Sequence, residues 1–95
     1  MFALVAKLRV DPDKVEAFET TFGEFATTFL DQEPGTLTYC LGRTSAEGDY
    51  RVIEIYESEA AFKRHVAGEG FQAFRPILIG FLSEPPSSER LSIVA

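Results

Sequence analysis

The hydrophobic positions of the chain follow two different periods, and the changes of period divide it into elements. Apolar residues occupy every second position from residue 2 to residue 10, which predicts a strand. Between residues 15 and 29 they recur at steps of three and four, which predicts a helix. This helical stripe consists of Val15, Phe18, Phe22, Phe25 and Phe29. Asp11 can cap the helix and Pro12 suits its first position, so we expect it to begin there and to end at Glu33-Pro34-Gly35.

Alternation returns in two further segments, residues 36–43 and 50–57, on either side of the turn sequence TSAEGD. Both segments are rich in residues that favour strands, so together they predict a hairpin. In the first strand Leu37, Tyr39 and Leu41 are expected on one face. In the second strand Glu54 stands out, because it is an acid on a face otherwise made of tyrosine and valine.

The last third of the chain predicts helix again and then a final strand. Ser58 can cap a helix that Gly68 and Gly70 interrupt. A second helical pattern covers residues 71–82, and Pro76 inside it predicts two short pieces that meet near Arg75. Residues 83–90, SEPPSSER, are interpreted as a linker, and residues 91–95 as a short strand.

The resulting order β-α-β-β-α-β predicts a fold of the α+β class. We expect a single domain over residues 1–95, with a ferredoxin-like antiparallel sheet and both helices on one face. The opposite face of the sheet is too apolar for water, so we expect a second copy of the chain to cover it in a homodimer.

Charge and composition exclude several classes of partner. Fifteen acidic against nine basic residues give a net charge of −6, which opposes binding to nucleic acid or to an anionic membrane. Lys7 and Arg9 interrupt the apolar N-terminus, so we expect neither a signal peptide nor a membrane span, and a cytoplasmic protein. One cysteine and one histidine provide no cluster for a metal site.

Two segments of the sequence resemble the antibiotic biosynthesis monooxygenase family, including its quinol monooxygenases. They are EPGTLTYCLGR and YRVIEIYESEAAFKRHVAGEGFQAF, which span residues 33–43 and 50–74. The motif that carries the resemblance is Glu-x-Tyr-x-Ser-x-x-Ala-Phe-x-x-His followed by a pair of phenylalanines. Its residues here are Glu54, Tyr56, Ser58, Ala61, Phe62, His65, Phe71 and Phe74.

The resemblance implies a ferredoxin-like subunit that pairs sheet to sheet into a dimeric α+β barrel, with a pocket between sheet and helices. It implies oxidation of a small quinol or phenol by O2 without metal, flavin or haem, so no cofactor is expected. Other members are isomerases, haem-degrading oxygenases or proteins without established activity. The chain lacks the asparagine and tryptophan of the haem-degrading members, and Arg75 stands where their histidine ligand would align.

His65 is the candidate base for such chemistry. Oxygenation without a cofactor requires a deprotonated substrate, because ground-state O2 accepts electrons one at a time and a phenolate donates them far better than a phenol. Histidine is the side chain whose ordinary pKa lies nearest to neutrality, and the chain has only one. The alternative is a half-exposed histidine that stacks on Phe62 or binds a strand.

The remaining candidates would bind the substrate or shape its pocket. Arg75 is expected to stabilise an anion or to pair with Glu54, or else to be a surface arginine. Tyr39 and Tyr56 are candidate hydrogen-bond donors, although strand tyrosines more often only pack. Glu54 is interpreted as half of a buried ion pair rather than as a base.

The pocket is expected to be shaped by Phe62, Phe71 and Phe74. We therefore expect a cofactor-independent monooxygenase that acts on a small quinol or phenolic compound. A non-oxidative isomerase and a small-molecule-binding protein of the same fold are the alternatives.

Overall fold

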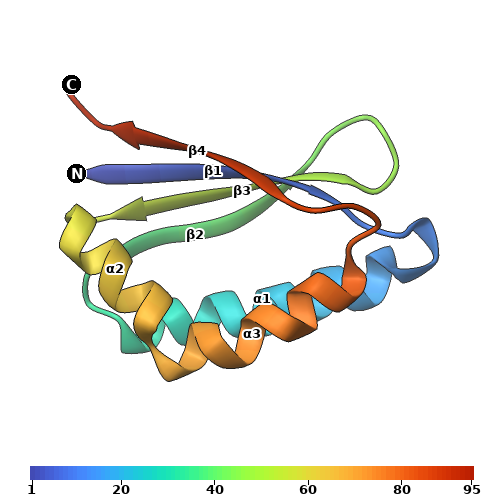
Figure 1. Cartoon of the computed structure of the whole chain (residues 1–95), viewed down its shortest axis with the longest axis horizontal. Helices are drawn as coiled ribbons and strands as arrows, with labels where there is room; N and C mark the ends of the chain where they lie inside the picture. Colours follow the sequence, from blue (N-terminus) through green and yellow to red (C-terminus); the bar gives the residue numbers. More distant parts are fainter.

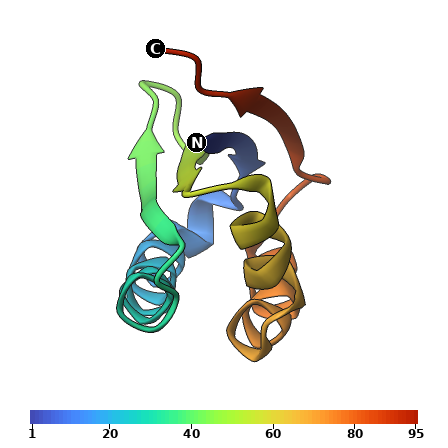
Figure 2. The same cartoon turned by 90° about the vertical axis from the view of Figure 1, so that its left-hand side faces the viewer.

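Four antiparallel strands form one sheet, and all the helices cover one of its faces (Figures 1 and 2). The computed structural model describes the whole chain, residues 1–95. Its strands are β1 (Phe2–Arg9), β2 (Thr36–Arg43), β3 (Asp49–Tyr56) and β4 (Ser87–Ser92). Its helices are the 3-10 turn η1 (Pro12–Lys14), α1 (Val15–Gln32), α2 (Glu59–Ala67) and α3 (Glu69–Phe81). The strand order β2-β3-β1-β4 confirms the predicted α+β, ferredoxin-like fold.

The register of β1 against β3 shows which residues face the helices. Leu4 lies opposite Glu54, and Leu8 lies opposite Tyr50. All four of these residues are buried, so they belong to the face that α1, α2 and α3 cover. The predicted alternation of both strands is therefore confirmed, including the position of Glu54 on the buried face.

The first residues of β2 do not alternate as predicted. Thr36 pairs with Tyr56, but Thr38 pairs with Ile55, which marks a bulge at Leu37. The extra residue moves Thr36 onto the buried face beside Tyr39 and leaves the Leu37 side chain 48% exposed. The expectation that Leu37 shares a face with Tyr39 was wrong for this reason.

The first helix begins with a turn of 3-10 helix rather than directly as an α-helix. The Asp11 side chain accepts a hydrogen bond of 3.1 Å from the backbone N–H of Asp13, and Pro12 occupies the first turn as predicted. The α-helix proper then runs from Val15 to Gln32.

Pro76 does not divide the last helix. The chain breaks instead at Gly68, whose backbone is extended, and α3 is continuous from Glu69 to Phe81. Proline has no N–H, so the carbonyl of Gln72, four residues earlier, lacks its helical hydrogen bond. Both residues are exposed, so water can hydrate that carbonyl. The two short pieces predicted to meet near Arg75 are therefore one helix.

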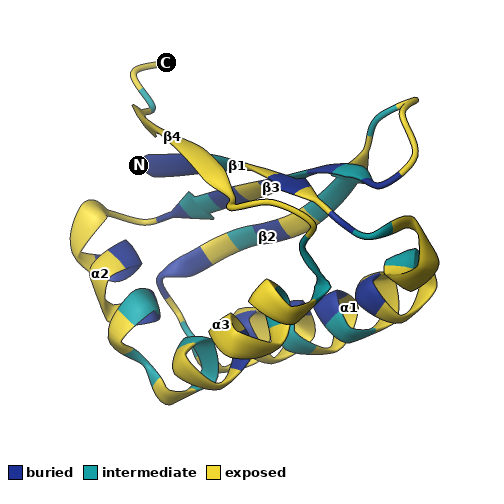
Figure 3. Ribbon diagram, turned by 45° about the vertical axis from the view of Figure 1, so that its right-hand side comes forward, coloured by how far each residue is buried: buried dark blue, intermediate teal, exposed yellow.

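The interpretation of residues 83–90 as a linker was also wrong, since β4 begins at Ser87. This strand pairs along β1 from Lys7 opposite Ser87 to Phe2 opposite Ser92. It lies at the edge of the sheet and every residue in it is exposed (Figure 3), so it shows no hydrophobic alternation.

Aromatic rings fill the space between the sheet and the helices. Phe22 stacks on Tyr39, and Phe29 contacts Tyr39 and Phe74 edge to face. A smaller cluster at the other end contains Phe2, Leu4, Tyr56, Ala61 and Phe62. Because α1 packs on the first cluster and α2 on the second, the core holds the two helices at fixed positions over the sheet.

The opposite face of the sheet has no helix on it (Figure 2). The register places Val5, Ile53, Ile55 and Leu91 on this face. Ile53 is 40% exposed and Leu91 is 46% exposed. We call this set the outer apolar face. No helix in the structure has the length and apolar character needed to cross a bilayer.

Candidate active site

A cavity of about 400 Å³ lies between the buried face of the sheet, helices α2 and α3, and the start of β4. Six of the residues singled out from the sequence line it: Tyr39, Glu54, Phe62, His65, Phe71 and Arg75. Two others, Tyr56 and Phe74, lie outside its wall. The residues at its α3 and β4 side include exposed ones, so the cavity reaches solvent there.

His65 is buried, with 2% of the residue exposed. Its ring packs against four aromatic rings, with the centroid of Phe29 at 4.7 Å and that of Phe71 at 4.9 Å. Tyr39 and Tyr56 complete the surround. The alternative of a half-exposed histidine stacked on Phe62 is therefore wrong, because His65 lies on the same buried side of α2 as Ala61 and Phe62.

The two ring nitrogens of His65 have different partners. Nδ1 lies 2.7 Å from Oε1 of Glu33, and Thr36 donates its hydroxyl hydrogen to the same oxygen at 2.8 Å. Nε2 is buried and has no hydrogen-bond partner in the protein. A neutral histidine beside a carboxylate carries its proton on the nitrogen that faces the carboxylate. The lone pair of a neutral His65 is therefore on Nε2, the nitrogen without a protein partner.

Glu33 is a site residue that sequence analysis missed, since it was interpreted only as part of a helix stop. It is the C-terminal cap of α1 and lies 32 positions before His65 in the chain. Gly35 lets this loop approach α2, because a Cβ at Gly35 would lie 2.6 Å from the Cβ of Ala61. The only signal in the sequence was a carboxylate directly before Pro34 and Gly35.

Glu54 is a buried carboxyl group without an ion-pair partner. The hydroxyl of Tyr56 donates a hydrogen bond of 2.5 Å to its Oε1, and no arginine or lysine pairs with it. The buried ion pair with Arg75 predicted from the sequence is therefore absent. Burial raises the pKa of Glu54 to about 7, while the hydrogen bond from Tyr56 acts in the opposite direction. At neutral pH this group exists in both protonation states.

The two strand tyrosines differ in what their hydroxyl groups do. Burial, reinforced by the charge of Glu54, raises the pKa of both Tyr39 and Tyr56, so both stay protonated. The Tyr56 hydroxyl is occupied by Glu54, and its ring lies behind the cavity wall. Tyr39 lines the cavity, and its hydroxyl makes no hydrogen bond to the protein.

Arginines lie at the exposed side of the cavity. Arg75 shares one face of α3 with Phe71 and Leu78, and all three residues line the cavity. Arg90 reaches it from β4, and sequence analysis missed this residue because the segment was interpreted as a linker. Phe74, on the other side of α3, is 1% exposed and packs in the core against α1, so it does not contact the cavity.

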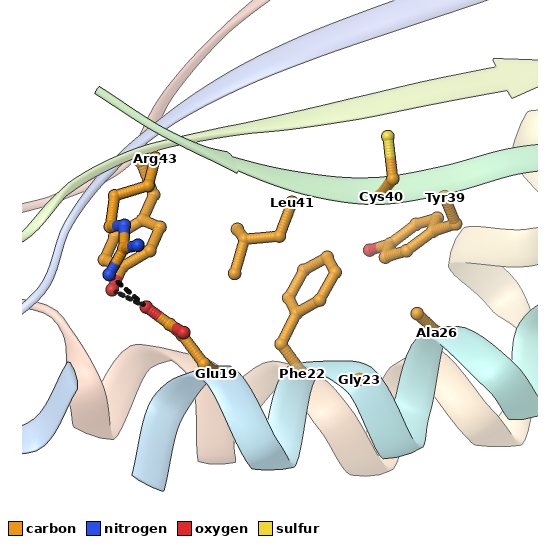
Figure 4. A pocket seen from close by; sticks show the side chains of 9 residues that line it. Glu19, Phe22, Gly23, Ala26, Tyr39, Cys40, Leu41 and Arg43 are labelled. Carbon is orange, nitrogen blue, oxygen red and sulfur yellow. Dashed lines mark hydrogen bonds and ion pairs between the residues drawn. The ribbon is translucent and has the colours of Figure 1, made fainter. Parts of the chain in front are cut away.

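A second concavity, of about 410 Å³, lies between α1 and β2 (Figure 4). Its wall includes Phe22 and Tyr39, which also line the cavity described above. Its charged groups are paired, since Tyr50 donates a hydrogen bond of 2.5 Å to Glu19 and Arg43 lies 3.7 Å from Glu19, whereas the Tyr39 hydroxyl has no protein partner. It contains neither a histidine nor an unpaired buried acid, so the first cavity is the better candidate for acid-base chemistry.

Comparison with known proteins agrees with this architecture. The family model described as "Antibiotic biosynthesis monooxygenase" matches residues 1–76. A Caulobacter crescentus protein named "putative antibiotic biosynthesis monooxygenase" has a solved structure similar to this one, with 35% sequence identity and a TM-score of 0.94. The similarity covers 99% of this chain and 90% of that protein.

More distant structures share the fold. Rv0793 from Mycobacterium tuberculosis is 21% identical, with a TM-score of 0.87 over 99% of this chain and 95% of that one. A Nitrosomonas europaea protein named "putative antibiotic biosynthesis monooxygenase" is 17% identical, with a TM-score of 0.90 over the full length of both chains. No curated protein matches the sequence. The family model and the Caulobacter relative together show that this chain belongs to the antibiotic biosynthesis monooxygenase family.

Proposed function

We propose that the protein is a cofactor-independent monooxygenase that oxidises a small quinol or phenolic compound with O2. The observation that carries the proposal is the unpaired, buried Nε2 of His65, a residue that lines a largely apolar cavity. Membership of a family described as monooxygenases supports oxygen chemistry. The apolar and aromatic lining suits a ring, and the part of the cavity at His65 is buried, which limits access of water to reactive intermediates there.

In the first step Nε2 of His65 removes the phenolic proton. The protonated ring is stabilised by Glu33, which accepts the hydrogen bond from Nδ1 and so acts as a positioning residue. The Glu33 side chain is 24% exposed, so solvent can reach it and take part in proton exchange. Tyr39, whose raised pKa keeps it neutral, can donate a hydrogen bond to the phenolate oxygen.

In the second step the phenolate transfers an electron to O2, and recombination forms a carbon–oxygen bond and a hydroperoxide. Cleavage of the oxygen–oxygen bond, with loss of the hydrogen from that carbon, leaves a carbonyl group and releases water. The overall reaction converts a quinol and O2 into a hydroxyquinone and H2O. Glu54 can supply the proton that the departing hydroxide needs, because burial raises its pKa to about 7.

The same pair of groups also favours a second candidate, an isomerase that moves a proton within a keto or enol compound. His65 and Glu54 line one cavity, and such a reaction needs one base and one acid but no O2. Turnover under anaerobic conditions separates the two candidates, since an oxygenase requires O2.

The outer apolar face supports a homodimer in which two sheets pack against each other as a dimeric α+β barrel. Ile53 and Leu91 on this face are large and substantially exposed in the single chain. Exposed apolar surface of this kind marks an interface in soluble proteins. The second copy would leave the cavity intact, because the cavity lies on the other side of the sheet.

Replacing His65 should abolish most of the activity. We expect His65→Ala to lower hydroquinone-dependent oxygen uptake by about 10²- to 10⁴-fold, the usual contribution of a positioned base. Glu33→Gln should lower the rate less, because His65 keeps its position in the aromatic core but its protonated ring loses the carboxylate beside Nδ1.

Glu24→Gln, an exposed change in the middle of α1, serves as the control for loss of one negative charge and should leave the rate unchanged. A His65→Ala protein with the wild-type rate would remove His65 from the mechanism.

Replacing Glu54 tests the acid. Glu54→Gln keeps an oxygen that can accept the Tyr56 hydrogen bond but cannot titrate. Because a carboxyl group with a pKa of about 7 donates its proton only below that pH, wild-type oxygen uptake should decline as the pH rises through about 7. The variant should be slower below pH 7 and lack this decline. Identical pH–rate profiles for the two proteins would contradict the role.

Unfolding in urea provides the control for Glu54→Gln. Between pH 4.5, the ordinary pKa of this carboxyl group, and about pH 7, Glu54 is protonated in the folded state but ionised in the unfolded state. Ionised Glu54 therefore destabilises the wild type, and its free energy of unfolding falls as the pH rises through this range. At about pH 8 the variant should be at least as stable as the wild type, so a slower variant cannot be explained by unfolding.

Dimerisation is tested by sedimentation at micromolar concentration. We expect a dimer for the wild type and a monomer for Ile53→Glu, which places a charge in the outer apolar face. Ile79→Glu is the matched control, because Ile79 is 48% exposed on α3 and should not affect assembly. A wild-type protein that sediments as a monomer would refute the homodimer.

A further inference from the structure

Two arginine side chains line the candidate active-site cavity, and neither is paired with a carboxylate. Arg75 comes from α3 and Arg90 comes from β4. The ion pairs of the structure involve Arg43, Arg51, Lys63 and His65, but not these two arginines. Their guanidinium groups are therefore available to a bound anion.

Arg90 is held in place by an aromatic ring. Its guanidinium carbon lies 5.2 Å from the centre of the Phe62 ring. Phe62 in turn contacts the rings of Phe2 and Tyr56, so it is a fixed platform. A guanidinium group over a ring face keeps its N–H donors at its own edges, where they remain free to bind a carboxylate through two hydrogen bonds.

Arg75 is directed at the same cavity by helix geometry. Phe71 precedes it by four residues and Leu78 follows it by three, and both line the cavity. Phe71 also contacts His65, with 4.9 Å between the ring centroids. An anion at Arg75 is therefore close to the part of the cavity where the base lies.

The charge of the cavity is positive although the chain as a whole is acidic. Glu54 is the only acidic residue in its wall, and burial raises its pKa to about 7. Two fixed positive charges thus face at most one negative charge, in a protein whose net charge is −6. Such a local reversal of sign favours a ligand that carries negative charge of its own.

We propose that the substrate is an aromatic carboxylate, a phenol or quinol that carries a carboxyl group, and that Arg75 and Arg90 bind this group at the exposed side of the cavity. The inference rests on the proposed function only in taking this cavity as the site where the phenol binds. A planar, singly charged carboxylate suits the flat guanidinium edge and balances the positive charge of the cavity. Binding it there orients the ring with its phenolic oxygen towards His65 and Tyr39.

The test is a calorimetric binding titration without O2, which makes it independent of turnover. The probes are 2,5-dihydroxybenzoate and its neutral amide, 2,5-dihydroxybenzamide, which have the same ring and nearly the same shape. We expect the acid to bind the wild type about tenfold more tightly than the amide, as a charge-assisted pair allows. Arg75→Gln and Arg90→Gln should each weaken binding of the acid several-fold and leave binding of the amide unchanged.

Arg9→Gln is the matched control, because it removes one positive charge from an exposed residue outside the cavity. Equal affinity for acid and amide, or an equal loss with Arg9→Gln, would overturn the inference. Loss of the preference for the acid in Arg75→Gln and Arg90→Gln, but not in Arg9→Gln, would support the inference even if the protein consumes no O2. Conversely, oxygen uptake with hydroquinone but no preference for the acid would leave the proposed function standing and refute this inference.

Discussion

The hydrogen bond between Glu33 and His65 connects the end of α1 with the last turn of α2 and determines what the cavity can do. Glu33 occupies Nδ1 at 2.7 Å, which leaves Nε2 without a protein partner. A buried nitrogen without a partner is unfavourable for folding. The fold tolerates it here because four aromatic rings hold the imidazole in place and Thr36 holds the same Glu33 oxygen. The arrangement is a base with a fixed tautomer at the wall of an apolar cavity.

The aromatic core serves this arrangement as well as stability. Phe29 packs on one side of His65 and belongs to α1, while Phe71 packs on the cavity side and belongs to α3. Gly35 removes the Cβ that would keep the loop after α1 away from α2. The position of the base is therefore set by packing between three helices rather than by any one of them, which makes it precise.

Much of the fold could be predicted from periodicity, because most of its elements have one buried and one exposed side. The alternation of β1 and β3 separated the residues of each strand into the two faces that the structure shows, and the phenylalanine stripe of α1 identified its buried side. Predictions failed where a structural feature produces no periodic pattern of apolar residues in the sequence. The bulge at Leu37 inserts one residue without a marker, and the fully exposed strand β4 has no apolar face to alternate.

The candidate site was predictable to the extent that its residues form a local motif. Glu54 and His65 are 11 positions apart on neighbouring elements, and both line the cavity as the motif suggested. Glu33 and Arg90 reach the same region from distant parts of the chain, so only the packing of the whole domain reveals them. Tyr56 and Phe74 belong to the motif as well, yet the first supports Glu54 and the second fills the core.

The proposed chemistry requires that Glu33 fix the tautomer of His65 and leave Nε2 open to a ligand. The chain contains a single histidine, so nitrogen NMR of protein labelled with ¹⁵N-histidine observes this ring alone. At neutral pH we expect a proton on Nδ1, none on Nε2, and a change in the Nε2 resonance when 2,5-dihydroxybenzoate is added without O2. A proton on Nε2 in the free protein, or an Nε2 resonance that the ligand leaves unchanged, would contradict it.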